Sequence, residues 1–192
     1  MLISAFKYIL DHFSDARKTK FSQHEVSQVL TEKIPALFVK QFLGKDYLIK
    51  GSAGKGNWAA VPWVAFLNPA VTYTTTQGYF VAYLFKEDMS GFYLALVLGF
   101  DELRGKEVVP LGVLKAKANA FKMRVQKPSL HFQQGPVSIG ALNSRSDYPK
   151  FYEAGTVLHR FYRKEKLPPE EELINDLTLI LIEYDRLVGT AP

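Results

Sequence analysis

Residues 78–98 read Gly-Tyr-Phe-Val-Ala-Tyr-Leu-Phe-Lys-Glu-Asp-Met-Ser-Gly-Phe-Tyr-Leu-Ala-Leu-Val-Leu, and this stretch decides the fold. Its two runs of aromatic, β-branched and aliphatic residues, 78–85 and 91–98, have the composition expected of β-strands. The polar residues between them, 86–90, form a connection of hairpin length. Both runs are apolar on both faces, which indicates strands at a sheet centre that helices cover. The stretch therefore predicts two neighbouring antiparallel strands.

More strands are expected before this hairpin. Val61–Leu67 has the same composition, and Tyr47–Lys50 is a shorter candidate. Downstream, glycine and proline residues break 101–150 into short strands and loops. These residues are Gly105, Pro110, Gly112, Pro128, Gly135, Pro136 and Gly140. We expect the antiparallel meander to lie within residues 46–150.

Apolar residues at helical spacing mark both ends of the chain. Residues 2–14 have the pattern of an amphipathic helix, and Ser22 with Glu25 is the capping pattern of a second helix. Three glutamates after Pro168 suit the partly positive start of a helix over 167–188. The predicted fold class is α+β, with a central, mostly antiparallel, strongly curved β-sheet flanked by N-terminal helices and a long C-terminal helix.

Length and composition limit the domain count and the chemistry. The chain has 192 residues, 47% of them hydrophobic and 22% charged, which is enough apolar material for one core. We expect a single domain over 1–192, helical at 1–45, with the sheet and its loops at 46–150 and the C-terminal helix at 167–188. The chain has no cysteine, and its four histidines are too scattered for a metal site. We therefore expect neither a cofactor nor a metal.

The two ends of the chain bear on its location and context. Lys7 and Asp11 interrupt the apolar pattern of residues 1–13, which is therefore neither a signal peptide nor a membrane span. We expect a cytoplasmic protein that does not contact a membrane. The last residues, Gly189-Thr-Ala-Pro192, have the composition of a helix stop or the start of a linker, which would fit an excised domain.

Positive charge is concentrated in one segment. The formal net charge is +5, and the stretch between Val113 and Leu130 has no acidic residue. Its basic residues are Lys115, Lys117, Lys122, Arg124 and Lys127. Such a segment can follow a phosphate backbone, because each neutralised phosphate releases condensed counterions. A solvated strand or helix face explains the pattern equally well.

Residues 51–63, Gly-Ser-Ala-Gly-Lys-Gly-Asn-Trp-Ala-Ala-Val-Pro-Trp, are the most unusual stretch. Gly51 and Gly56 have the spacing of a Walker A loop, but Asn57 follows where that loop needs a lysine. A nucleotide-phosphate loop is therefore not supported. The glycines do permit positive φ angles and close approach of the backbone to a partner, and Lys55 adds a charge at the tip.

The two tryptophans of the chain, Trp58 and Trp63, would lie on opposite sides of an extended segment. One can fill the core while the other faces a groove, although both could be core residues. A glycine-rich, lysine-bearing loop beside an indole and two aromatic strands would form an aromatic wall with a basic lip. Nucleobases stack on surfaces of this kind.

These motifs together resemble a known family. The run Gly51-Ser-x-Gly-x-Gly-Asn-Trp-Ala-x-Val-Pro-Trp-Val-Ala-Phe is similar to the McrB N-terminal (MrcB-like) DNA-binding domain of modification-dependent, type IV restriction systems. The runs Thr76-Gln-Gly-Tyr-Phe-Val-Ala-Tyr-Leu-Phe and Phe92-Tyr-Leu-Ala-Leu, and the ending Leu167-Pro-Pro-Glu-Glu-Glu-Leu, are similar to the same family. The resemblance covers residues 47 to 188.

The resemblance implies a domain that binds double-stranded DNA and flips a modified cytosine, for example 5-methylcytosine, into an aromatic pocket. It implies that Trp63 is one wall of the pocket, Phe80 the opposite wall and Leu84 its floor. Ala82 shares a strand face with Phe80 and Leu84, and its small side chain would leave room for the base. The residues expected to contact DNA are Lys50, Ser52, Lys55, Asn57, Lys115, Lys117, Lys122, Arg124 and Lys127.

The same resemblance implies that this domain is a specificity module and not an enzyme. An AAA+ GTPase module and an McrC-like nuclease subunit, fused or separate, would hydrolyse GTP and cut DNA. We expect the isolated domain to be monomeric. No nuclease pattern is convincing, since Asp101-Glu102 followed by Lys106 is a coincidence of a loop, and Ser52 has no triad partner nearby in sequence.

One position departs from the family pattern. The best understood members carry an aromatic residue in the glycine loop that fills the gap left by the flipped base, whereas this chain has Lys55. The stem of a lysine can occupy such a gap while its ammonium group pairs with a phosphate. The alternative function is a generic DNA- or peptide-binding module without modified-base specificity. Salt dependence separates DNA binding from peptide binding, because the affinity for nucleic acid falls steeply as salt rises whereas peptide capture would be indifferent to salt.

Overall fold

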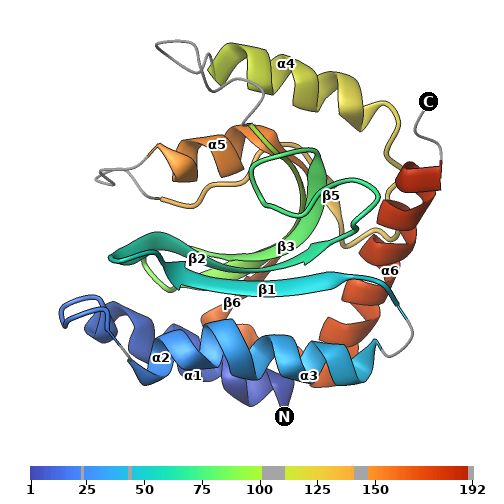
Figure 1. Cartoon of the computed structure of the whole chain (residues 1–192). Coiled ribbons are helices and arrows are strands. Elements are labelled where there is room, and N and C mark those ends of the chain that lie inside the picture. Colours follow the sequence, from blue (N-terminus) through green and yellow to red (C-terminus); the bar gives the residue numbers. More distant parts are fainter. Residues whose placement is uncertain (23, 43–44, 101–110, 141–146, 190–192) are drawn as a thin grey trace.

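The computed structural model describes residues 1–22, 24–42, 45–100, 111–140 and 147–189. Helical layers lie on both sides of a central sheet (Figure 1). The elements in chain order are α1 (Leu2–Ala16), α2 (Glu25–Gln28), the π-helical turn η1 (Val29–Lys33), α3 (Ile34–Gln41), β1 (Leu48–Gly54), β2 (Trp58–Leu67), β3 (Tyr79–Phe85), β4 (Gly91–Leu98), α4 (Leu111–Lys122), β5 (Gln133–Gln134), α5 (Tyr148–Gly155), β6 (Thr156–Arg163), the 3-10 turn η3 (Lys164–Lys166) and α6 (Glu170–Gly189).

Strands β1 to β4 form the expected meander. Within the described residues the sheet has the order β1-β2-β3-β4-β6-β5, and each neighbouring pair is antiparallel. The α+β class, the antiparallel sheet, the N-terminal helices and the C-terminal helix are confirmed. The sheet also contains β6, which begins at Thr156 and therefore lies beyond the segment 46–150 to which the sequence assigned the strands.

Two local expectations were wrong. The second helix begins at Glu25 and not after Ser22, because His24 is its N-cap and the His24 Nδ1 accepts a hydrogen bond of 3.2 Å from the Val26 amide. Residues 111–122 form the helix α4 rather than short strands and loops. Gly112 is the second residue of α4 and Pro128 follows its end, so neither interrupts it. Gly105 and Pro110 lie outside the described residues.

One sheet face packs against α1, α3 and α6, and we call it the helical face. The Phe6 ring of α1 lies 4.8 Å from the Tyr83 ring and 4.9 Å from the Phe92 ring, measured between centroids. The Phe38 ring of α3 stacks on Tyr83 at 5.7 Å. All four rings are fully buried. Since each buried aromatic side chain contributes about 1.5–3 kcal/mol, this cluster is a large part of the core.

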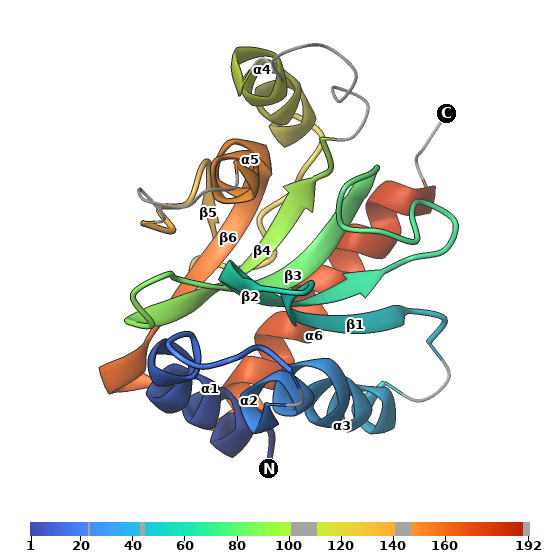
Figure 2. The ribbon, with the colours of Figure 1, turned by 60° about the vertical axis from the view of Figure 1, so that its left-hand side comes forward.

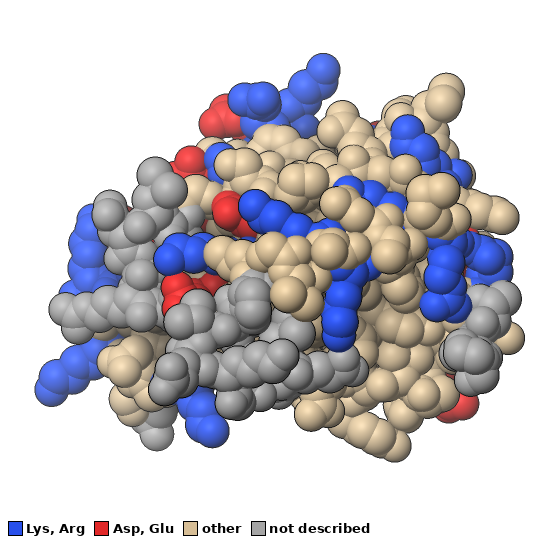
Figure 3. Space-filling view, turned by 90° about the horizontal axis from the view of Figure 1, so that it is seen from above, with Lys and Arg blue, Asp and Glu red and all other residues tan. Residues whose placement is uncertain are grey.

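The opposite face, which we call the α5 face, is covered differently. α5 contacts β4, and α4 contacts both α5 and β6, so these helices lie across the sheet from α1 (Figure 2). Figure 3 looks down on this side of the molecule, where Lys and Arg side chains are spread widely and Asp and Glu are fewer. No helix in the described part of the chain is long and apolar enough to cross a membrane.

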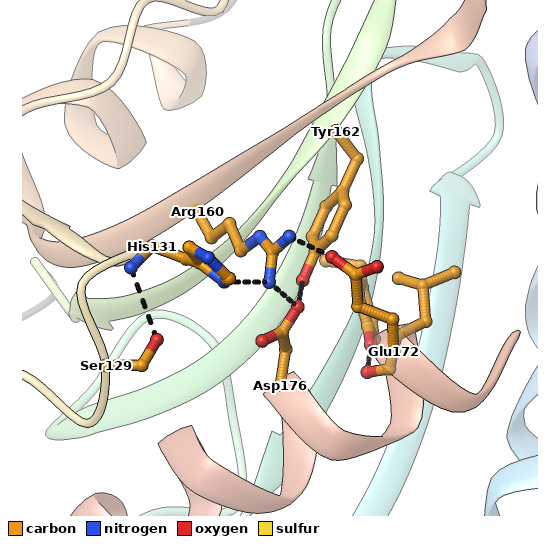
Figure 4. A network of polar contacts seen from close by, with 8 residues as sticks. Ser129, His131, Arg160, Tyr162, Glu172 and Asp176 are labelled. Carbon is orange, nitrogen blue, oxygen red and sulfur yellow. Dashed lines mark hydrogen bonds and ion pairs between the residues drawn. The ribbon is translucent and has the colours of Figure 1, made fainter. Parts of the chain in front are cut away.

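A buried polar network fastens α6 to β6 on the helical face (Figure 4). The Arg160 guanidinium of β6 pairs with Asp176 and Glu172 of α6. The Tyr162 hydroxyl donates to Asp176 Oδ2 at 2.7 Å, and His131 Nδ1 lies 3.1 Å from Arg160. The Asp176 side chain is only 3% exposed. The charges of this network are paired with one another, which is the arrangement that buried ions require.

At one point the helical layer also contacts the sheet backbone to backbone. At Gly51 of β1, a Cβ atom would lie 1.7 Å from the Leu30 carbonyl oxygen of η1. No side chain fits in this space, because even the closest Cβ contacts in proteins are well beyond 1.7 Å. Glycine is therefore required here by close approach of two backbones rather than by its φ angle.

We predict that Gly51→Ala lowers the free energy of unfolding by about 1–3 kcal/mol or more, because η1 must move away from β1. Urea denaturation followed by circular dichroism measures the change. Gly112→Ala is the matched control, since nothing lies within 4 Å of its added Cβ and its φ is ordinary. The control should leave stability unchanged or raise it slightly. Equal stability of Gly51→Ala and the parent would contradict the contact with η1.

We predict that Asp176→Ala destabilises the fold by up to about 3–5 kcal/mol, because the partly buried Arg160 guanidinium loses its buried carboxylate partner and keeps Glu172, whose side chain is 40% exposed. Thermal unfolding gives the change. Asp15→Ala removes a carboxylate from the exposed Asp15–Lys18 pair and should leave the midpoint almost unchanged. If the two variants unfold at the same temperature, the network does not hold α6 in place.

Candidate nucleic-acid interface

The β1–β2 hairpin presents the residues that the sequence singles out around Lys55. All three residues of its tip, 55–57, are exposed. Gly54 has φ +129° and Gly56 has φ +73°, which are backbone conformations that other residues rarely adopt. A Cβ on Gly54 would also lie 2.0 Å from the Asn57 carbonyl oxygen. The glycines therefore shape a tight turn that holds Lys55 and Asn57 out into solvent.

Ser52 plays a different part from Lys55 and Asn57. It lies within β1, beside an irregularity in the strand register that falls between Ser52 and Gly54. Its hydroxyl accepts a hydrogen bond of 3.2 Å from the Gly54 amide and is half-buried. The structure thus places Ser52 at the base of the turn, where it stabilises the turn, while Lys55 and Asn57 occupy the tip.

The two tryptophans do lie on opposite faces of β2. Trp58 packs on the rings of Phe13, Phe21 and His24, and its Nε1 donates to the Thr19 carbonyl at 3.0 Å. Trp58 therefore anchors the hairpin to the connection between α1 and α2. Trp63 lies on the α5 face, where Ser52 and Leu84 are its cross-strand neighbours.

An open depression of about 600 Å³ lies between the hairpin tip and the α1–α2 connection. Its lining is mostly polar, and Lys20 is exposed within it, whereas Arg17 is paired with Glu87 at 3.2 Å. The lining residues are Arg17, Thr19, Lys20, Phe21, Ser22, Gly56, Asn57 and Trp58. Residues 17–22 could not be connected with the hairpin from sequence, because the contacts of Trp58 with Thr19 and Phe21 join segments far apart in the chain.

Small residues form a row on the α5 face, and we call this row the trough. Ala65, Ala82 and Ala95 are cross-strand neighbours on β2, β3 and β4, and each is at most 1% exposed. Lys50 continues this row at the β1 edge, and His159 continues it on β6. The sequence singled out Ala82, but its two alanine neighbours follow from strand register, which the sequence does not specify.

Larger side chains border the trough. Trp63 and Leu84 are neighbours on one side, and Phe80 lies on the other, four residues along β3 from Leu84. Four residues of strand span about 13 Å. The structure therefore brings all the expected pocket residues to one face, with Trp63 and Phe80 at opposite sides of the alanine row. Phe80 and Leu84 are fully buried, whereas Trp63 is partly exposed.

Tyr152 of α5 reaches toward Trp63 across this face. Burial raises the pKa of the Tyr152 hydroxyl to about 12, and hydrogen bonds with the Thr75 and Trp63 side chains act against this rise. Tyr152 is 3% exposed and Thr75 is 8% exposed. Trp63 is thus joined to α5 and to the β2–β3 loop, 68–78, through a shared hydroxyl group.

His159 closes the far end of the alanine row. Burial lowers its pKa, and a hydrogen bond to the Gly135 carbonyl opposes this shift. The ring also packs edge-on against Tyr93 at 5.5 Å. A histidine with a lowered pKa is neutral at pH 7, so the charge in this row comes from Lys50 at the opposite end.

The basic segment 113–130 begins as the helix α4. Leu114 and Ala118 form its buried stripe, and Lys115, Lys117 and Lys127 are exposed. The Lys122 ammonium donates to Asn119 Oδ1 at 2.6 Å, and the Arg124 guanidinium lies over the Phe121 ring at 5.3 Å. α4 is on the same side of the sheet as Trp63. A helix of this kind suits both phosphate contact and plain solvation.

The residues that the structure describes contain no group of three or more His, Asp or Glu side chains placed to hold a metal ion. The Asp101, Glu102 and Lys106 cluster lies outside the described residues. What the described site offers is a row of small buried side chains beside an indole, an exposed hairpin tip and a basic helix.

Comparison with known proteins identifies the family of the chain. No curated protein matches the chain. The family described as "MrcB-like, N-terminal domain" matches residues 8–189, which is nearly the whole chain and includes the hairpin, the sheet, α4 and α6. The chain therefore belongs to the MrcB-like N-terminal domain family, and a DNA-binding role in type IV restriction goes with that membership.

Proposed function

We propose that this domain recognises a modified cytosine in double-stranded DNA by taking the flipped base onto the α5 face beside Trp63. The observation that carries the proposal is the alanine row Ala65, Ala82 and Ala95, bordered by Trp63, Leu84 and Phe80. Three small neighbours in the middle of a sheet leave more room above the strands than large side chains would, once the groups that now cover them move aside. A flat pyrimidine ring has the shape for it, and Trp63 has the ring for stacking.

The trough is covered in the present structure, so base entry requires a rearrangement. The alanines are buried, and Thr75 and Tyr152 stand next to Trp63. An entering base would replace the contacts of Trp63 with Thr75 and Tyr152 by stacking on Trp63. Unpairing the base from its partner in the duplex costs a few kcal/mol. Modification that weakens pairing or adds apolar area favours this exchange. Trp63, the partly exposed member, is where the base would first make contact.

Contacts with the DNA backbone would come from the basic groups around this face. Lys55 and Asn57 project from the hairpin, and Lys50 lies at the β1 edge. Lys115, Lys117, Lys122, Arg124 and Lys127 would extend the surface along α4 and the residues after it. Lysine and arginine at such positions add affinity that falls as salt rises and that carries little sequence information.

The domain would act as a targeting module. We infer that an AAA+ GTPase module and an McrC-like nuclease subunit, fused or separate, supply GTP hydrolysis and DNA cleavage, while this domain supplies recognition. The decisive experiment is a binding competition between duplexes that are identical except for one cytosine, which is plain, 5-methylated, 5-hydroxymethylated or N4-methylated. Equal binding to all of them would reduce the function to generic DNA affinity.

We predict that Trp63→Ala removes most of the discrimination between modified and plain duplexes, because stacking in the pocket is lost. Stacking on an aromatic side chain contributes about 1–3 kcal/mol per base, so a roughly tenfold loss for the modified duplex is expected. Fluorescence anisotropy with both duplexes measures it. Trp63→Phe is the control and should retain part of the preference. If Trp63→Ala binds both duplexes as the parent does, the pocket assignment fails.

We predict that Lys55→Ala weakens binding to modified and plain DNA alike. Loss of one phosphate contact should reduce the slope of log affinity against log salt by about 0.9. Titrations between 50 and 200 mM salt, roughly the range over which such slopes are measured, give the slope. Lys40→Ala removes an equal charge from α3, on the helical side of the sheet, and should leave the slope unchanged. Identical slopes for both variants would exclude Lys55 from the interface.

A further inference from the structure

The β2–β3 loop, 68–78, projects beyond the strands that it joins (Figure 2). Three threonines brace it: the Thr72 hydroxyl donates to the Thr74 carbonyl at 2.8 Å and accepts from the Thr74 amide at 3.1 Å. The Thr74 hydroxyl in turn accepts from the Thr76 amide at 2.9 Å. Asn68 closes the start of the loop through its carbonyl, which accepts from the Val71 and Thr72 amides. A loop with this many internal bonds holds one shape.

The side chain that this loop displays is an aromatic ring. Tyr73 is 63% exposed, and it is the one Phe, Tyr or Trp among the described residues that the solvent reaches to this extent. The other aromatic side chains are buried or half-buried. A large ring held in water on a braced loop gains nothing for the fold, so its position suits contact with another molecule.

A positive charge accompanies the ring. The Lys50 ammonium of β1 donates to the Tyr73 carbonyl at 3.1 Å and is exposed. One of its protons is thereby directed into the loop, while the others remain available for an anion. The Tyr73 ring and the Lys50 ammonium group are therefore exposed at the same place on the surface. The Tyr73 carbonyl oxygen holds the ammonium group there.

This place adjoins the trough. Lys50 is the cross-strand neighbour of Ala65 at the β1 end of the alanine row. Thr75, two residues after Tyr73, bonds to the Tyr152 hydroxyl that also meets Trp63. The loop thus joins the exposed ring to the covered face, and Tyr73 lies at the rim where DNA would have to approach.

We propose that Tyr73 and Lys50 form a second nucleotide contact, in which the Tyr73 ring stacks on a base or deoxyribose outside the trough and the Lys50 ammonium neutralises the adjoining phosphate. The proposal rests on the DNA-binding function proposed above, but it concerns affinity for DNA in general. Stacking of this kind is tolerant of sequence, because every base has a π face. The braced loop lowers the ordering cost on binding.

The test compares three substitutions at Tyr73 by anisotropy with the plain and the modified duplex. Tyr73→Phe keeps the flat ring and should bind within about twofold of the parent. Tyr73→Ala and Tyr73→Leu remove the ring and should each lose about tenfold on both duplexes, within the range of stacking on one base. Their salt slopes should match the parent, since no charge is removed, whereas Lys50→Met should lower the slope by about 0.9.

Val39→Ala is the matched control, because Val39 is an exposed apolar side chain on α3, and it should bind as the parent does. If Tyr73→Leu binds both duplexes with the affinity of the parent, stacking is overturned in favour of simple apolar contact. If Tyr73→Ala binds both duplexes with the affinity of the parent while Lys55→Ala still weakens binding, this inference is overturned and the proposed function stands. A parent chain that binds no duplex would overturn both.

Discussion

The packing of Phe6 against Tyr83 and Phe92 is the interaction on which the rest of the structure depends. It gives one sheet face a complete hydrophobic cover from the N-terminal helices. Because that face supplies the aromatic core, the opposite face does not need large side chains at its centre, and it can carry a row of alanines instead. The two faces can differ in this way because successive side chains of the same strand point to opposite faces of the sheet.

The sequence predicted the elements whose signals are local. The strands around Val61–Leu67 and 78–98 and the terminal helices follow from composition and spacing, and they lie where expected. β6 was not predicted, because His159 and Arg160 interrupt its apolar residues and the partners of Arg160 lie on the later helix α6. A strand stabilised by ion pairs with a later helix has no apolar alternation to reveal it.

The site shows the same limit. Motif resemblance indicated Trp63, Phe80, Ala82 and Leu84, and strand alternation placed the last three on one face. Register was needed to add Ala65 and Ala95, since a slip of one residue would send both to the helical face. Tyr73 could not be found by pattern at all, because an exposed tyrosine in a threonine-rich loop becomes noticeable only when the bonds of the loop are known.

The anchoring of Trp58 gives the N-terminal helices a part in recognition that their own surface does not suggest. The hairpin that carries Lys55 is clamped at Gly51 by η1 and at Trp58 by the carbonyl of Thr19. Its tip is free, while its two legs are held by residues far earlier in the chain. The N-terminal helical region thus sets the orientation of the hairpin. A substitution that loosens this region would change the angle at which the hairpin meets a duplex, even with every DNA-facing side chain intact.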